Sequence, residues 1–231
     1  MKDESAELRE RQRFLDSIVH NLRASLRGIG TSSELLSREW EARFDEQSKT
    51  FLKAIRDGAA TLDNLAKALA DYSMALLPES SSSAVLPVEY AVKMAMAPLQ
   101  PRILEMGAEV RCDTLPRLEA NHEQLSVLFR CLVSNALDYR DSGRPPRIEI
   151  SAQRAGEEWR FEVKDNGMGI APEYLEKVFE PFERLRGSHR SPGLGLAICR
   201  KIVEGHGGKI WVESQEGQSA TFFFTLPSSG G

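Results

Sequence analysis

The chain has 231 residues, of which 41% are hydrophobic, and it carries a formal net charge of −4 with a pI near 5.7. This length suits one large domain or two small ones, and the mild negative charge gives no electrostatic reason to expect nucleic acid or an anionic membrane as a partner. Three cysteines stand far apart without a CxxC pair, which argues against a disulfide framework or a zinc site and favours a reducing compartment.

The opening residues, MKDESAELRERQRF, are polar and have the composition of neither a signal peptide nor a membrane anchor. No apolar run in the chain is long enough to cross a bilayer. We therefore expect a cytoplasmic chain with no membrane contact of its own.

Heptad spacing predicts a long amphipathic helix in the first part of the chain. Every a position of the heptad is aliphatic, and three further residues widen the apolar stripe. The a positions are Leu8, Leu15, Leu22, Ile29 and Leu36, and the further residues are Ile18, Val19 and Leu26. A polar break around REWEARFDEQSK ends this helix.

A second helix follows, with apolar residues at spacings that alternate between four and three. A hairpin of two such helices leaves each apolar stripe about half covered, so we expect two copies of the chain to form a four-helix bundle. The predicted homodimer contact extends from Gly30 to Leu69 and the flanking turns. The apolar positions of the second helix are Phe51, Ile55, Gly58, Leu62, Leu65, Leu69, Tyr72 and Leu76.

His20 lies on the first helix at position f of the heptad, which points away from the apolar seam. We therefore expect its ring in solvent and not in a core. An ordinary solvated surface residue is the simpler interpretation of a lone histidine there, and a functional interpretation depends on the rest of the chain.

A serine run between prolines, LLPESSSSAVLP, marks a domain boundary. We expect a helical hairpin over residues 1–77, a linker over 78–86 and a second domain over 87–231. In the second domain helices and strands alternate, with a long helix that opens at Asn121 and a closing hairpin of KIWVES and SATFFFTLP. The expected fold is an α/β sandwich with helices on one face of a mixed sheet.

Two glycine-rich stretches of the second domain suit nucleotide chemistry. KDNGMGI places Asp165 at the end of a strand, before Gly167 and Gly169, where a buried carboxylate can accept a hydrogen bond from an exocyclic amine such as that of adenine. SPGLGLAI places Gly193 and Gly195 at a helix N-terminus, which favours a phosphate. Taken alone, an ordinary Asx turn and an ordinary glycine-rich helix start are the simpler explanations.

Two other stretches are less specific. Asn135, in VSNALDYR, can offer an amide oxygen to a hard cation such as Mg²⁺, although a surface asparagine is the simpler explanation. Phe179 and Phe182, in VFEPFERL, are typical of residues that anchor a core.

The set and order of these stretches resemble a known family. NALDYR, KDNGMGI, VFEPFERL, PGLGLAICRKIVEGHGGKIWVES and GQSATFFFTLP are similar to the N box, the glycine boxes and the F box of sensor histidine kinases, and HNLRASL is similar to their H box. The resemblance covers nearly the whole chain and is closest to the branch that includes phytochrome-like kinases. It implies a dimerisation and phosphotransfer hairpin followed by an ATP-binding domain of the gyrase and histidine-kinase type.

The resemblance also implies a role for each matching residue. His20 would accept the γ-phosphoryl group of ATP and pass it to an aspartate of a response regulator, while Asn135 would hold Mg²⁺. Asp165 would bind the adenine amine, and Thr221 would lie beside the base. The implied ATP-binding residues are Asn135, Tyr139, Asp165, Gly167, Gly169, Ile170, Phe182, Gly193, Leu194, Gly195, Leu196 and Thr221.

In the H box the chain departs from the family at three positions. Asn21 stands where the family usually has an acidic residue that removes the imidazole proton, and because an amide cannot take up that proton we expect slow phosphorylation. Ala24 replaces a residue that positions water for phosphatase activity. Ser25 replaces a proline, which removes a kink above the histidine.

The nucleotide-binding boxes depart from the family as well. Cys131 and Asp138 replace an asparagine and a lysine, and a carboxylate near a triphosphate is repulsive unless a metal lies between them. The lid is short and has Ser191 and Pro192 in place of glycine, and Ser219 and Ala220 loosen the last glycine box. We expect these changes to weaken ATP binding.

Three function classes follow from these residues. The first is a protein histidine kinase that phosphorylates itself slowly. The alternative is a pseudokinase dimer that signals by protein contact alone. A gyrase-like ATPase without a phosphoacceptor is disfavoured, because the helical hairpin presents His20 to solvent.

Overall fold

The computed structural model describes residues 2–40, 43–77, 83–183 and 192–228. The chain forms two compact units, one that contains two helices up to Met74 and one that begins at Ala75. Within the described residues, none of the helices combines the length and the apolar composition that a bilayer crossing requires.

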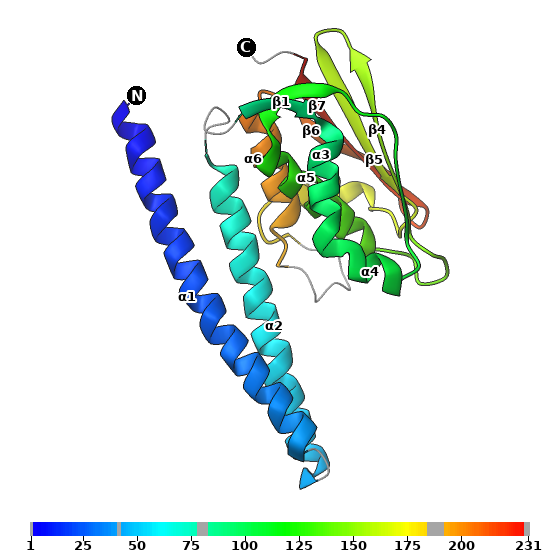
Figure 1. Ribbon diagram of the computed structural model, residues 1–231. Coiled ribbons are helices and arrows are strands. Elements are labelled where there is room, and N and C mark those ends of the chain that lie inside the picture. The colour runs from blue at the N-terminus through cyan, green and yellow to red at the C-terminus, as the bar shows by residue number, and fades with distance from the viewer. Residues whose placement is uncertain (1, 41–42, 78–82, 184–191, 229–231) are drawn as a thin grey trace. The chain divides into compact units, whose positions relative to one another are not determined.

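The first unit is a hairpin of two long helices, as the heptad pattern predicts. Helix α1 extends over Lys2–Trp40 and helix α2 over Glu46–Ala75 (Figure 1). The carboxylate of Asp45 caps α2, because its Oδ1 atom accepts a hydrogen bond from the Ser48 amide at 2.8 Å. The predicted polar break therefore contains the start signal of the second helix.

The contact between α1 and α2 uses a row of residues beside the predicted a positions. The buried residues on α1 are Val19, Leu26 and Ser33, which are spaced seven residues apart. On α2 the buried row also repeats every seven residues and is made mainly of small side chains, which allow the two helices to approach closely. This row consists of Leu52, Ala59, Ala66 and Ser73.

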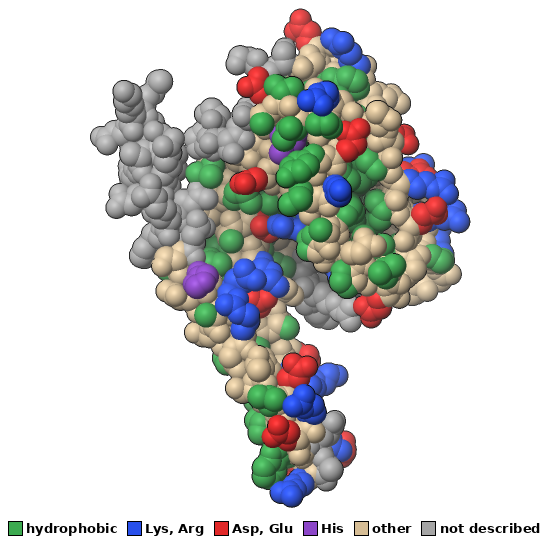
Figure 2. All heavy atoms as spheres, in the orientation of Figure 1, with side chains coloured by type: hydrophobic (Ala, Val, Ile, Leu, Met, Phe, Trp, Pro, Cys, Tyr) green, Lys and Arg blue, Asp and Glu red, His purple; other side chains and the backbone are tan. Residues whose placement is uncertain are grey.

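Part of the predicted apolar stripe, including the a positions Leu22, Ile29 and Leu36, lies beside this contact and is exposed in the single chain, whereas Val19 and Leu26 are buried in it. Hydrophobic side chains gather on the surface of the hairpin (Figure 2). On the two helices they are Ile18, Leu22, Ile29, Leu35, Leu36, Trp40, Phe51, Ile55, Leu62, Leu65 and Leu69, with exposed fractions between 38% and 60%. The side chain of Leu8 lies outside the described residues.

The second unit opens with a small sheet and a broken helix. Strand β1, Ser83–Pro87, pairs antiparallel with β3, Arg117–Asn121, so strand structure begins within the segment expected to be a linker. Helix α3, Val88–Met96, continues through the 3₁₀ turn Ala97–Leu99 into helix α4, Gln100–Glu105. The prolines at positions 98 and 101 account for this interruption of the helix.

The main sheet has five strands in the order β2-β4-β5-β7-β6 and is mixed, as predicted. Strand β2 is parallel to β4, and the other neighbouring pairs are antiparallel. Helices α3, α5 and α6 cover one face of this sheet (Figure 1). The strands are β2 Glu109–Cys112, β4 Arg147–Ala155, β5 Glu158–Asp165, β6 Ile210–Gln215 and β7 Ser219–Pro227.

Two helices carry the candidate site residues of this unit. Helix α5 extends over His122–Asp138, and its N-cap Asn121 accepts a hydrogen bond from the Gln124 amide at 3.1 Å. Helix α6 extends over Gly195–Gly205, and two 3₁₀ turns at Pro172–Tyr174 and Lys177–Phe179 precede it. The helix predicted to open at Asn121 is thus confirmed.

An aromatic cluster joins α5 to the sheet. Phe129 meets the rings of Phe161 and Phe224 edge-on, with centroids 6.4 and 5.8 Å away, and these two rings stack at 4.8 Å. All three side chains are fully buried. The packing fixes α5 against the middle of strands β5 and β7, on the same face of the sheet as Asp165.

Candidate functional site

Asp165 ends strand β5 and is buried, with 8% of its surface exposed. Its Oδ1 atom accepts a hydrogen bond from the Gly167 amide at 2.8 Å. Burial raises the pKa of the Asp165 carboxyl, and the amides of Gly167 and Ala220 and the nearby Arg144 guanidinium act against this rise. A buried carboxylate has further lone pairs with which it can accept a hydrogen bond from a ligand amine.

Gly167 is required by the close approach of the turn after β5 to the end of α5. A Cβ atom at this position would lie 2.5 Å from the carbonyl oxygen of Tyr139 and 2.9 Å from Oδ1 of Asp165. The same Tyr139 oxygen accepts a hydrogen bond from the Met168 amide at 3.0 Å. The turn therefore lies directly against the backbone of Tyr139, next to Asp165.

Further hydrogen bonds hold this turn against the β6–β7 hairpin. The Gly217 amide donates to the Met168 oxygen at 2.6 Å, and the Ile170 amide donates to Ser214 Oγ at 2.8 Å. Gly169 between them has a left-handed backbone with φ of 69°. The predicted residues Gly169 and Ile170 thus lie in the same rigid loop as Asp165.

An arginine that the sequence did not single out also fixes this loop. Arg144 Nη2 donates to the Gly167 oxygen at 3.1 Å and to the Gln218 oxygen at 2.7 Å. It connects three segments that are far apart in the chain. Nothing in the residues around position 144 indicates these contacts, so sequence reasoning had no signal for it.

Phe182 and Gly193 lie on either side of the segment predicted to be the lid, and Phe182 is 66% exposed, so the expectation that it anchors a core is wrong, whereas Phe179 is buried. The Phe182 amide donates to the Gly193 oxygen at 2.7 Å, and both residues have a left-handed backbone, with φ of 67° and 74°. A Cβ atom at Gly193 would lie 2.9 Å from the Glu183 oxygen. Such a conformation is costly for phenylalanine, and strained residues of this kind cluster at ligand sites. Ser191 lies outside the described residues.

The start of α6 rests on α5 at Cys131. A Cβ atom at Gly195 would meet the Cys131 Cβ and Sγ atoms at 3.8 and 3.9 Å. Leu194 is buried just before the helix, and Leu196 in its first turn is half-buried. The helix predicted to begin at these glycines does start at Gly195.

One face of α5 carries Cys131, Asn135 and Asp138. They share this face because Asn135 follows Cys131 by four residues and Asp138 follows Asn135 by three. All three side chains are half-buried. Asp138, which we expected to repel a triphosphate, forms an ion pair with Arg102 of α4, with 2.7 Å between Nη2 and Oδ1. The structure thus neutralises this carboxylate within the fold.

Thr221 is the predicted site residue that the structure separates from Asp165. On β7 the residues Ala220 and Phe222 are buried against the helices, and the strand alternation turns the Thr221 side chain to the opposite face of the sheet. The register pairs Asp165 with Ala220 and Thr221 with Lys164. Ala220, and not Thr221, is therefore the β7 residue that lies beside Asp165 on the helix-covered face.

His20 and Asn21 lie on α1 in the first unit, and both are exposed, as the heptad position predicts for His20. Ser25 Oγ donates a hydrogen bond to the backbone oxygen of Asn21 at 3.2 Å. The imidazole is thus accessible to a reagent from solvent.

No group of three or more His, Cys, Asp or Glu side chains that could hold a metal ion occurs in the part of the chain that the structure describes. A cation at Asn135 would therefore depend on ligands from a bound nucleotide as well as on the Asn135 amide oxygen. This fits Mg²⁺, which usually keeps few protein ligands and several phosphate or water oxygens.

Comparison with known proteins agrees with this geometry. Residues 120–230 match the profile of the histidine kinase-, DNA gyrase B-, and HSP90-like ATPases. Cyanobacterial phytochrome A of Nostoc sp. strain PCC 7120 is 36% identical over 223 residues, which cover 96% of this chain and 29% of that protein. The methanogenesis regulatory histidine kinase FilI of Methanothrix harundinacea is 31% identical over 95% of this chain and 25% of that protein. This chain thus spans less than a third of the length of both relatives.

A solved structure has the same fold. The crystal structure of the histidine kinase ThkA in complex with the response regulator protein TrrA superposes with a TM-score of 0.61 at 24% sequence identity. The match covers 98% of this chain and 66% of that chain. Two long helices followed by a mixed α/β sheet are therefore an arrangement found in a histidine kinase.

Proposed function

We propose that this chain transfers the γ-phosphoryl group of ATP to its own His20. The proposal starts from the family of the chain, because residues 120–230 belong to the histidine kinase-, DNA gyrase B- and HSP90-like ATPases. The chain is also homologous to sensor histidine kinases. The observation that carries the proposal is the buried Asp165 beside the close turn at Gly167. Activity, substrates and partners of a longer protein are part of the same proposal.

The residues of the second unit fit a nucleotide. Gly167 lets the turn after β5 pack directly against the Tyr139 oxygen, next to a carboxylate that can accept a hydrogen bond from the adenine amine. The start of α6 at Gly195 offers backbone amides to phosphates, and Asn135 lies on the adjoining face of α5. Together these groups would orient the base at one end of α5 and the phosphates along it.

In the reaction an imidazole nitrogen of His20 attacks the γ-phosphorus of ATP. The new P–N bond forms as the bond from phosphorus to the β,γ-bridging oxygen breaks, ADP leaves, and the ring proton passes to solvent. Mg²⁺, held by Asn135 and the phosphates, would supply positive charge that offsets charge on the phosphoryl oxygens. Asn21 can orient the imidazole by a hydrogen bond but cannot take its proton.

The proposal is tested by incubating the purified chain with γ-labelled ATP and Mg²⁺. We expect a label that is stable in alkali and lost in acid, as a phosphohistidine is, and we expect none in the His20→Ala variant. An equal thermal stabilisation of both proteins by ATP is the control that the variant still folds and binds nucleotide. Undiminished labelling of His20→Ala would contradict the assignment.

The pseudokinase alternative gains no support from the site. Asn135, Asp165 and the glycines of both nucleotide stretches are present, and the ion pair with Arg102 removes the expected repulsion by Asp138. We therefore favour the active kinase.

The exposed stripe of the hairpin supports a homodimer. Leu22 and Ile29 on α1 and Leu62 and Leu69 on α2 are between 38% and 48% exposed, although their spacing is that of a helix-packing seam. A contiguous apolar surface of this kind is typical of an interface. A second copy of the hairpin would cover it in a four-helix bundle.

Replacing Leu62 and Leu69 with glutamate should convert the dimer to a monomer at micromolar concentration, because two charges would be buried in the interface. Light scattering after size exclusion measures the mass. The matched control is Ala60→Glu with Asn64→Glu, two exposed positions on the opposite side of α2. A native chain that is already monomeric would contradict the dimer.

We place the receiving partner among response regulators, in which an aspartate would take the phosphoryl group from His20. ThkA has been solved in complex with such a regulator, which supports this choice of partner. We place the chain in the cytoplasm, since Cys112, Cys131 and Cys199 are all free thiols, as expected in a reducing compartment.

A further inference from the structure

The ion pair between Arg102 and Asp138 connects two helices of the second unit. Arg102 Nη2 lies 2.7 Å from Asp138 Oδ1, and Arg102 Nη1 donates a hydrogen bond to Ser134 Oγ at 3.2 Å. Ser134 and Asp138 are four residues apart on α5, so one guanidinium spans a full turn of that helix. The side chains of Arg102 and Asp138 are 33% and 13% exposed.

Asp138 lies on the α5 face of the proposed nucleotide site, close to the end at which the Asp165 turn contacts Tyr139. Asp138 is three residues from Asn135 on the same helix face, and it directly precedes Tyr139, whose oxygen accepts a hydrogen bond from the turn after Asp165. At the other end of this face, Cys131 touches Gly195 at the start of α6. A polyphosphate that extends from the Asp165 turn toward α6 therefore passes beside Asp138.

The charge of Asp138 is unfavourable at that place unless it is compensated. A carboxylate and a polyphosphate repel each other, and the repulsion is strong beside a side chain that is only 13% exposed, where the effective dielectric constant is below that of water. Arg102 is the residue that compensates it, and it does so from α4 and not from the helix that carries Asn135.

We propose that Arg102 is a positioning residue that allows the proposed nucleotide site to accept a polyphosphate, because it neutralises Asp138 beside the phosphates. The inference rests on the proposed nucleotide site, and it adds that the affinity of this site for phosphates depends on Arg102. Binding of the phosphates requires Arg102, and binding of the base does not. If the ion pair only held α4 against α5, its loss would weaken the binding of ATP and of adenosine equally.

The experiment measures the affinity of ATP with Mg²⁺ and of adenosine by calorimetry for four proteins: the native chain, Arg102→Ala, Asp138→Asn and the double variant. We expect Arg102→Ala to weaken ATP binding at least about tenfold, the ratio that roughly 1.4 kcal/mol represents. Adenosine binding should stay within about twofold. Asp138→Asn should bind ATP at least as well as the native chain, and the double variant should regain the ATP affinity that Arg102→Ala loses.

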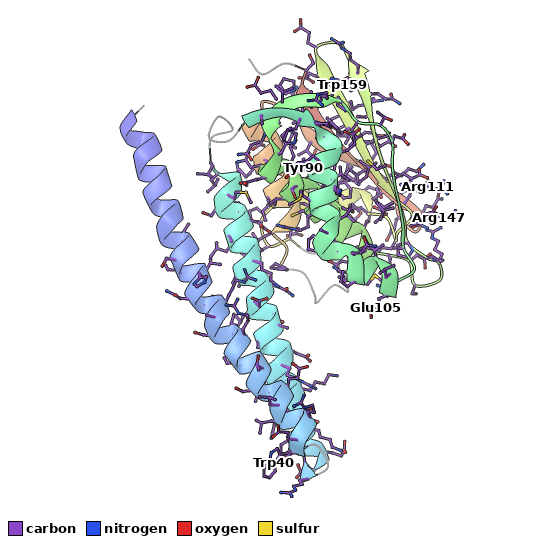
Figure 3. All side chains as sticks on the ribbon, in the orientation of Figure 1. Trp40, Tyr90, Glu105, Arg111, Arg147 and Trp159 are labelled. Carbon is purple, nitrogen blue, oxygen red and sulfur yellow. The ribbon has the colours of Figure 1, made fainter. Side chains whose placement is uncertain are left out.

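The matched control is Arg111→Ala. Arg111 lies on β2, points away from the helices (Figure 3), and pairs with Glu109 at 2.8 Å, so the variant also loses an arginine and an ion pair. It should bind both ligands like the native chain. The defect of Arg102→Ala should also shrink as salt is added, since it arises from charge.

Any other pattern overturns the inference, including equal losses for ATP and adenosine, no loss for ATP, or a double variant that stays as weak as Arg102→Ala. If the native chain binds neither ligand, the proposed nucleotide site fails together with the inference. If the native chain and all three variants bind ATP equally well, the nucleotide site stands and only the role of Arg102 is wrong.

Discussion

Replacing Asn21 with aspartate or glutamate should speed autophosphorylation by about 10² to 10⁴-fold, the range typical of general base catalysis. A carboxylate next to His20 can take the ring proton as the nitrogen attacks phosphorus, whereas the asparagine amide only donates or accepts a hydrogen bond. Asn21 is exposed on α1, so the substitution should cost little stability. The initial rate of incorporation of γ-labelled phosphate measures the effect.

Thr31→Glu is the matched control for charge alone. Thr31 is exposed on the same helix and lies eleven residues from His20, roughly 16 Å along the axis, too far to take the proton. It should leave the rate unchanged. If neither the native chain nor the acidic variants are labelled, the missing base is not the bottleneck, and the pseudokinase alternative gains ground. If the native chain is labelled rapidly and the acidic variants are labelled no faster, another group accepts the proton.

Asp165→Asn should abolish the thermal stabilisation of the chain by ATP and ADP. In the native chain ATP at a hundredfold its dissociation constant should add about 2.7 kcal/mol to the free energy of unfolding, while GTP should add almost nothing. Guanine presents an oxygen where adenine presents its amine, and a buried carboxylate faced with that oxygen gains no hydrogen bond. The asparagine replaces one acceptor oxygen with a donor and so no longer matches adenine.

Melting temperatures with each nucleotide test this prediction. Asp113→Asn, which changes an exposed carboxylate of the same unit, should respond to ATP like the native chain. Equal stabilisation of the native chain by GTP and ATP would contradict the assignment of Asp165 to the adenine amine. Retained stabilisation of Asp165→Asn by ATP would do the same.

Local features of the sequence were enough to predict most of the elements. Heptad spacing predicted both long helices and an exposed His20, because the side chain at each position of a regular helix has a fixed direction. Asn121 marked the start of α5, since a cap depends only on the next few residues. The turn after Asp165 was predictable for the same reason, as its shape depends on two nearby glycines.

Register and long-range pairing depended on the tertiary structure. Thr221 and Ala220 are equally plausible neighbours of Asp165 from their position in the chain, and only the pairing of β7 with β5 decides which one shares its face. Arg102 and Asp138 are 36 residues apart, and their ion pair exists because α3, from which α4 continues, packs against α5. The sequence therefore indicated the Asp138 carboxylate but not the arginine that pairs with it.

The apolar pattern of the hairpin also left one choice open. Val19 and Leu26 belong to one row that repeats every seven residues, and Leu22 and Ile29 belong to its neighbour, so periodicity by itself determined a helix with a broad apolar stripe. It did not determine which row faces α2. In the tertiary structure the Val19 row faces α2, because the small side chains of Ala59 and Ala66 let the two helices approach along it. The larger residues Leu22 and Ile29 therefore stay exposed for a partner.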